Sequence, residues 1–166
     1  MKFTKSIFIK SIFPVLTLVI LFLFSACGNE NNIYRNHEDV NSVGFKWNIS
    51  DEKTYKVNVE EEGIYDISIE LRHGISIPYS NVLLILTHET PDGKATEEKV
   101  DFTLRDAENN PVGQGVGDTF DTQQKVMSNF KLEKGTYTFK IRHAVPQADP
   151  LSPILEVGLV VDKVKK

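Results

Sequence analysis

Cysteine is almost absent from this sequence, because Cys27 is the only one in 166 residues. A chain with one cysteine cannot close an internal disulfide, so its folded part must be held together by a hydrophobic core. An excess of basic residues is also missing: 19 lysines and arginines stand against 23 acidic residues, and the formal net charge is −4. Nucleic acid is bound through basic surfaces, so we expect no nucleic-acid partner.

Short catalytic motifs are absent as well. The sequence has no G-x-S-x-G nucleophile elbow and no H-E-x-x-H zinc motif. Four aspartates that could offer oxygens to calcium lack the spacing of a calcium loop; they are Asp101, Asp106, Asp118 and Asp121. We therefore predict that the protein is not an enzyme and has no metal and no cofactor. A hydrolase whose acids converge from separate strands is a third and weaker hypothesis.

Two histidines continue the apolar faces of predicted strands. His73 lies two residues after Leu71, and His143 lies two residues after Ile141. Inward histidines near strand ends could bind a metal or titrate in a cleft. We favour the alternative, a partly buried histidine hydrogen-bonded to a neighbour, because no zinc-like spacing accompanies either residue.

The glycine-rich run Gly113-Gln114-Gly115-Val116-Gly117 raises the question of a nucleotide site. The dinucleotide fingerprint needs a helix directly after the glycines, so that the phosphates meet the helix N-terminus. The residues that follow have no helical pattern. We predict a bend between strands instead, where glycine allows positive φ or close backbone approach.

The N-terminus has the layout of a secretory signal. Lys2, Lys5 and Lys10 precede an uncharged run over residues 12–24, which ends at Ser25-Ala26-Cys27. The run is shorter than the about 20 apolar residues that a spanning helix needs. Leu23-Phe24-Ser25-Ala26-Cys27 resembles a bacterial lipobox, apart from Phe24 where leucine is usual. We predict cleavage before Cys27 and lipid attachment to it; the alternative is a plain signal peptide that leaves a free thiol.

The mature chain divides into two parts on composition. Residues 28–42 are polar and rich in asparagine, and such a segment buries too little to offset its ordering entropy. We predict residues 1–26 as a lipoprotein signal peptide, 27–44 as the lipidated N-terminus with a flexible tether, and 45–166 as one folded domain.

The folded part shows the two-residue periodicity of β-strands. Apolar and polar residues alternate over residues 55–59, 65–71, 100–104, 126–132, 137–141 and 155–161, and residues 82–86 are continuously apolar, which is typical of a central strand. Turn signals such as Pro91-Asp92-Gly93 separate the segments. The fold class we predict is all-β: a single antiparallel β-sandwich, either jelly-roll or Ig-like.

One predicted loop combines residues suited to recognition. Arg72 ends one strand, and Pro78-Tyr79-Ser80-Asn81 leads into the next. Arg72, Tyr79 and Asn81 are therefore our candidate partner or ligand contacts. The structural alternative is that Pro78 fixes the bend, Tyr79 packs on the sandwich edge and Asn81 bonds the loop backbone.

Five segments in order resemble one known family. They are Leu71-Arg72-His73, Pro78-Tyr79-Ser80-Asn81, Pro91-Asp92-Gly93, Gly113-Gln114-Gly115-Val116-Gly117 and Leu155-Glu156-Val157-Gly158-Leu159. Together they are similar to the GldH gliding-motility lipoproteins of Bacteroidetes, over residues 47–162. The resemblance implies an envelope lipoprotein of the gliding machinery and of the type IX secretion system linked to it. The family has no established catalytic residues, so the resemblance implies none in this sequence.

These observations lead to one expected function and one alternative. We expect a non-enzymatic accessory lipoprotein, anchored by lipid on the periplasmic side of the inner or outer membrane, whose partners are envelope proteins of the gliding and secretion machinery. The alternative is a carbohydrate-binding β-sandwich module with Trp47, Tyr55 and Tyr79 as stacking platforms for sugars.

Overall fold

The computed structural model describes residues 31–165, which form nine β-strands and one short 3-10 helix. The predicted signal peptide and Cys27 lie outside the described residues. The strands are β1 (Asn32–Asp39), β2 (Lys53–Val59), β3 (Gly63–Gly74), β4 (Asn81–Glu89), β5 (Ala95–Thr103), β6 (Gln114–Val116), β7 (Thr119–Leu132), β8 (Gly135–His143) and β9 (Ile154–Lys163), and the 3-10 helix is Pro146–Ala148.

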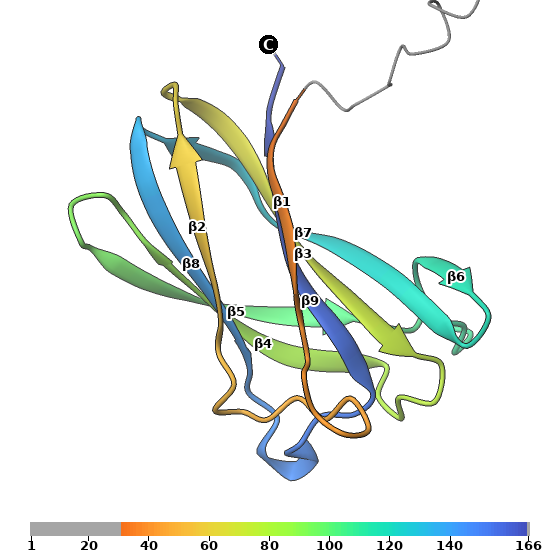
Figure 1. The fold of residues 1–166 in the computed structure, drawn as a ribbon. Helices are drawn as coiled ribbons and strands as arrows, with labels where there is room; N and C mark the ends of the chain where they lie inside the picture. The colour runs from red at the N-terminus through yellow and green to blue at the C-terminus, as the bar shows by residue number, and fades with distance from the viewer. Residues whose placement is uncertain (1–30, 166) are drawn as a thin grey trace, which may run out of the picture. The chain divides into compact units, whose positions relative to one another are not determined.

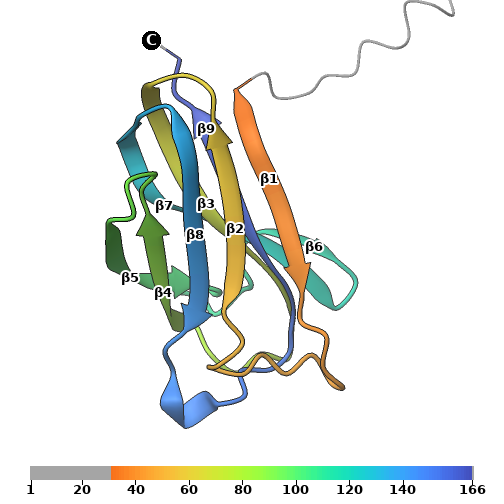
Figure 2. The same cartoon turned by 60° about the vertical axis from the view of Figure 1, so that its left-hand side comes forward.

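The strands form two antiparallel sheets that pack face to face as a sandwich (Figures 1 and 2). The five-stranded sheet has the order β1-β9-β3-β7-β6, and the four-stranded sheet has the order β2-β8-β4-β5. The pairing is nested: β1 with β9, β2 with β8, β3 with β7 and β4 with β5, in alternate sheets. This nesting is the arrangement of a jelly roll, so the all-β sandwich prediction is confirmed and its jelly-roll form is selected.

The core lies between the sheets and follows the alternation read from the sequence. In β2, for example, Tyr55, Val57 and Val59 are buried while the residues between them are exposed. Strand β4 is central, between β8 and β5, but only partly buried on its outer side, because Ile85 is covered and Leu83 is exposed. The largest fully buried side chains are those of Trp47, Tyr55, Tyr65, Phe102, Phe139, Ile67, Ile69, Leu71, Ile77, Leu84, Leu86 and Leu104.

The segment predicted as a flexible tether contains strand β1, so that prediction is wrong for Asn32–Asp39. This strand lies at the sheet edge and pairs with β9 along its length. Its side chains show no apolar alternation, because most of them are exposed or half-buried. Backbone hydrogen bonds to β9 hold β1 in the sheet, and the composition of the segment does not reveal this pairing.

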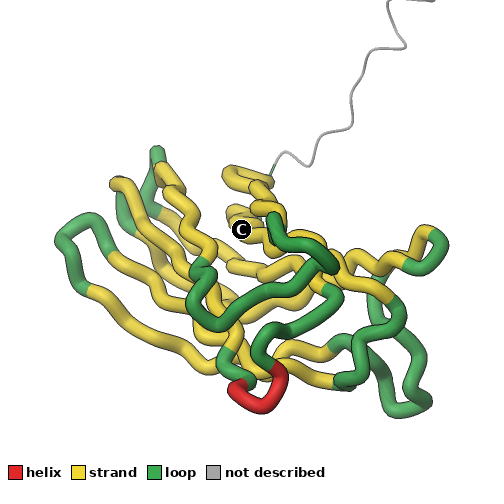
Figure 3. The backbone as a smooth tube through the Cα atoms, turned by 60° about the horizontal axis from the view of Figure 1, so that its bottom comes forward, coloured by secondary structure: helices red, strands yellow, loops and turns green. Residues whose placement is uncertain are grey.

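The two ends of the sandwich differ in what they carry. Because β1 and β9 are antiparallel, β1 begins and β9 ends at one end of the five-stranded sheet. The opposite end, called the distal end below, carries the β1–β2 and β3–β4 connections and the 3-10 helix between β8 and β9 (Figure 3).

Candidate functional site

The outer face of the five-stranded sheet carries an ordered array of charged and amide side chains. Alternation in β3 turns Leu71 and His73 into the core, which leaves Glu70 and Arg72 on the outside. Strand register then sets their neighbours across the sheet. One row runs through Glu156, Arg72, Asp121 and Gln114, and the next runs through His37, Gly158, Glu70 and Gln123.

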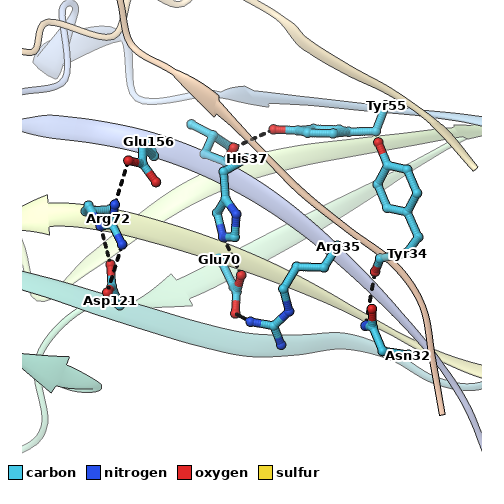
Figure 4. Close-up of polar contacts among 10 residues, drawn as sticks. Asn32, Tyr34, Arg35, His37, Tyr55, Glu70, Arg72, Asp121 and Glu156 are labelled. Carbon is cyan, nitrogen blue, oxygen red and sulfur yellow. Dashed lines mark hydrogen bonds and ion pairs between the residues drawn. The ribbon is translucent and has the colours of Figure 1, made fainter. Parts of the chain in front are cut away.

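Arg72 is the centre of the first row and holds a carboxylate on each side (Figure 4). Its Nε and Nη2 donate to the two carboxylate oxygens of Asp121 at 2.6 and 3.2 Å, and its Nη1 donates to Glu156 Oε1 at 2.6 Å. This fork keeps the pKa of Asp121 below its usual range and raises the pKa of the guanidinium. Because Arg72 is 39% exposed, each pair stabilises the fold by only about 0.2–1 kcal/mol.

Glu70 is the centre of the second row and has two partners on β1, Arg35 and His37. Arg35 Nη1 donates to its Oε1 at 2.8 Å, and His37 Nε2 lies 2.5 Å from its Oε2 (Figure 4). The histidine reaches across β9 only because residue 158 is glycine. A Cβ on Gly158 would lie 2.4 Å from Cδ2 and 2.7 Å from Nε2 of His37. The missing side chain is therefore part of the site.

A shallow groove of about 460 Å³ runs over this face. It is lined by Arg35, Glu70, Gly113, Gln114, Asp121 and Gln123. The β6–β7 hairpin forms one side, and its glycines are needed there: a Cβ on Gly113 would lie 2.2 Å from the carbonyl oxygen of Asp121, and φ at this residue is +106°. The prediction of a glycine-rich bend between strands is confirmed only at the two ends of the run, because Gln114–Val116 form strand β6 while Gly113 lies in a bend and Gly117 in a turn.

The chemistry of the groove suits recognition of a polar surface. Its carboxylates are ion-paired with arginine or histidine. A general acid needs a pKa raised toward neutrality, whereas the pKa of Asp121 is lowered. Charged groups held in fixed positions on a sheet can instead pair with complementary groups of another protein.

The three predicted contact residues lie in different settings. Arg72 belongs to the charged face, through partners on β7 and β9. Tyr79 is half-buried and packs against the core. Asn81 begins β4 and its side-chain amide donates to Thr103 Oγ1 on β5, at 3.4 Å. Their contacts do not join them into one site, and their role as partner contacts stays a prediction.

Sequence reasoning missed Glu70, Asp121 and Glu156, the acidic partners on the charged face. Alternation along β3 and β9 identifies outward-facing positions, and that signal was available. Which outward residues of separate strands become neighbours depends on register, which periodicity does not encode.

The proposed aromatic platform for sugars is contradicted for two of its three residues. Trp47 and Tyr55 are fully buried. The Trp47 indole donates to the Asp51 carbonyl at 2.7 Å, and the Tyr55 hydroxyl donates to the Val157 carbonyl at 2.7 Å. Tyr79 is half-buried against the core. The Trp47 and Tyr55 rings are packing residues with satisfied polar ends, so they offer no planar surface to a sugar.

The histidines of the predicted strands also belong to the interior. His73 Nε2 lies 3.1 Å from Thr122 Oγ1, and its Nδ1 lies 3.2 Å from the Gly74 carbonyl oxygen. His143 is fully buried, with its ring edge against Trp47. Burial lowers the pKa of both. Within residues 31–165, no three histidine, cysteine or acidic side chains gather in a way that could hold a metal ion.

None of the helical structure described in residues 31–165 is long and apolar enough to cross a membrane.

Three of the five family-like segments meet on the charged face. Arg72 comes from the first, Gly113 and Gln114 from the fourth, and Glu156 and Gly158 from the fifth. They are far apart in sequence and become neighbours only through the sheet order β9-β3-β7-β6.

Comparison with known proteins identifies the family. The family model described as GldH lipoprotein matches residues 32–161. A gliding motility lipoprotein GldH homolog of Christiangramia forsetii is 24% identical over 156 residues, covering 92% of this chain and 93% of that protein. The gliding motility lipoprotein GldH of Flavobacterium johnsoniae is 25% identical over 156 residues, covering 90% and 94%.

Among solved structures, TmCBM61 in complex with β-1,4-galactotriose has a TM-score of 0.34 and 14% identity, covering 69% of this chain and 62% of that one. A likeness of that size carries no functional argument, whereas the family model spans most of the chain and nearly all of the described sandwich. The chain therefore belongs to the GldH lipoprotein family.

Proposed function

We propose that this protein is a lipid-anchored accessory component of the gliding machinery and of the type IX secretion system linked to it. Lipid on Cys27 holds it at the periplasmic side of the inner or outer membrane. The charged face around Arg72 and Glu70 contacts another envelope protein. The observation that carries the proposal is that three of the five segments by which the chain resembles a gliding-motility family contribute residues to this one face.

The electrostatics of the face support a protein partner. Its charges alternate in sign along the first row, from Glu156 through Arg72 to Asp121, and Arg35 pairs with Glu70 of the second row. A partner with complementary charges would therefore gain several charge pairs at once. Such contacts set specificity and association rate more than affinity, and exposed ones weaken as salt screens them. The membrane anchor offsets the weak affinity by keeping the protein near its partner.

The proposal is tested by deleting the gene in the organism that encodes it and restoring it as variants. Wild type should restore colony spreading and secretion of type IX cargo. Cys27→Ala should fold but fail to restore either, because the sandwich is no longer held at the membrane. Arg72→Gln should reach the membrane and restore spreading only partly, because both carboxylates of its row lose their partner.

Arg142→Gln is the matched control for Arg72→Gln. Arg142 is on β8 in the other sheet, is similarly exposed and has only a long contact of 3.8 Å to Glu97. It should restore spreading in full. Normal spreading and a normal secretome in the deletion strain would refute the proposed function. Equal behaviour of the two arginine variants would refute the role of the charged face.

A further inference from the structure

The distal end of the five-stranded sheet displays large apolar side chains to solvent. Among the described residues, four of the six exposed large hydrophobic residues lie toward this end: three in connections and one at the last residue of β6. They are Val43, Phe45, Ile75 and Val116, which are 96%, 49%, 42% and 84% exposed. We call these four residues the apolar rim. Single exposed apolar residues are ordinary, but a group at one end of a domain marks an interaction site.

The loop that presents Val43 and Phe45 is closed by its own hydrogen bonds. The Ser42 hydroxyl accepts from the Lys46 amide at 2.6 Å and donates to the Lys46 carbonyl at 2.7 Å. The Phe45 amide donates to the Ser42 carbonyl at 3.0 Å. The Gly44 carbonyl accepts from the Ser152 hydroxyl at 3.0 Å. These bonds fix the backbone of the loop in one conformation, which exposes the two apolar side chains to solvent.

The backbone of this loop is strained at the residue that carries the ring. Phe45 has φ of +53°, in the left-handed region that bulky side chains rarely adopt. Glycine or asparagine would fit there at less cost. Strained backbone and an exposed ring are both unfavourable for the free domain. Such outliers persist at binding sites, where the strained conformation is the one that a partner recognises.

Backbone hydrogen bonds join the connections of the rim across the sheet end. The Phe45 carbonyl accepts from Ile154 at 2.9 Å, and the Pro153 carbonyl accepts from Gly74 at 3.2 Å. Next to Gly74, the Ile75 amide donates at 2.8 Å to the carbonyl of Asp118, in the turn after Val116. The loops therefore form one connected surface that is already organised, which reduces the ordering cost of binding.

We propose that the apolar rim inserts into a concave apolar pocket of another envelope protein, with Phe45 as the anchor. This inference rests on the proposed function and adds a second contact at a different place. Four side chains alone cannot supply the about 800 Å² that each side of a stable interface buries. Two copies that met through their rims would bury only this small area on each side, so a second copy does not fit. A pocket that surrounds the rim gains the missing area, and an aromatic ring in a pocket is the usual energetic centre of an interface.

The rim lies at the other end of β1 from the point where the chain enters the sandwich. The segment that follows Cys27 joins the fold at Asn32, where β1 begins. Eight strand residues at about 3.4 Å each place the rim roughly 27 Å from that end. A protein that stands at the membrane and extends away from it is the partner that this geometry fits.

The test combines photocrosslinking with complementation, using the full chain in the organism that encodes it. Benzoylphenylalanine at position 43 should give one discrete adduct with a different protein. Phe45→Asn should abolish this adduct, since it removes the ring while asparagine tolerates the backbone conformation. The double variant Val43→Ser with Phe45→Asn should melt at the same temperature as wild type or higher, and should not restore spreading.

Leu83→Thr is the matched control, because Leu83 is 37% exposed on the outer side of the other sheet. This variant should keep the adduct and restore spreading. The inference is overturned by an adduct of twice the chain's mass, by crosslinking to lipid alone, by no adduct, or by a double variant that restores spreading. A deletion strain that spreads normally would refute the proposed function instead, and the loss of the adduct in Phe45→Asn would still report on the rim.

Discussion

Mild acid should unfold this domain through its buried histidines. His73, His88 and His143 are 1%, 6% and 0% exposed. Burial disfavours their charged forms and lowers the pKa of each in the folded state. In the unfolded chain each has a pKa of about 6.5. The unfolded state therefore binds more protons below pH 6.5, so the free energy of unfolding falls as the pH drops below that value and stops falling at the folded-state pKa values.

The size of the effect follows from linkage. A group protonated only in the unfolded state removes about 1.4 kcal/mol of stability per pH unit. Three such histidines remove up to about 4 kcal/mol per unit, a large share of the about 5–15 kcal/mol typical of a domain. Asp149, 3.7 Å from His143, offsets part of this by stabilising the protonated ring. Carboxylates such as Asp66 and Asp121 have lowered pKa values in the folded state, and the stability that they contribute is lost only as the pH falls to about 4 and below.

Urea unfolding of a chain that starts at Gly28, at pH 7.5, 6.5 and 5.5, measures this slope. His88→Leu should reduce the slope by about one third, and at pH 7.5 it should cost little, because it removes a buried Nδ1 that has no hydrogen-bond partner. Phe139→Leu changes a ring that lies 6.4 Å from the His88 ring, and it should lower stability by about 1 kcal/mol equally at every pH. Equal stability at pH 7.5 and 5.5, or an unchanged slope in His88→Leu, would refute the reasoning.

Two further predictions concern single contacts. Tyr55→Phe should lower the free energy of unfolding by about 1–2 kcal/mol, because the buried Val157 carbonyl loses the hydroxyl that donates to it; urea unfolding measures this, and no loss would mean that the carbonyl gains another donor. Gly158→Ala should displace the His37 ring from Glu70 while stability changes by less than about 1 kcal/mol, since alanine suits a strand better than glycine and the lost pair is exposed. NMR contacts between the His37 ring and the Glu70 side chain should vanish, and their persistence would contradict the steric argument.

Periodicity predicted the strands that bury one face and missed those that do not. Strands β2, β3 and β8 alternate clearly because one face of each covers the core. In β9 the residues from Val157 to Val161 are all buried, although its apolar residues still recur at every second position. Strand β1 has mostly exposed or half-buried side chains, so its sequence resembles a tether. In β5 the first five residues are exposed, and only Val100 and Phe102 are buried, which is why the predicted strand began at Val100.

The candidate site could be predicted only in part, because it depends on register. Arg72 was singled out as a cation next to a loop. Its carboxylate partners lie 49 and 84 residues further along the chain. They reach Arg72 through the nested order of the jelly roll, and alternation along one strand carries no information about which strand lies beside it. The role of Gly158 is equally hidden, since it comes from a histidine that crosses β9.

The early start of β1 has a consequence for how the protein searches for partners. Only residues 28–31 separate Cys27 from β1. The five Cα–Cα steps from Cys27 to Asn32 span at most about 3.3–3.6 Å each, so the connection can reach roughly 17 Å. Lipid on Cys27 would thus confine the sandwich to a thin layer at the bilayer, where the effective concentration seen by a neighbouring membrane protein is in the millimolar range. Contacts too weak to detect between the soluble proteins would be well occupied there, so reconstitution in one membrane is the setting in which this partnership becomes measurable.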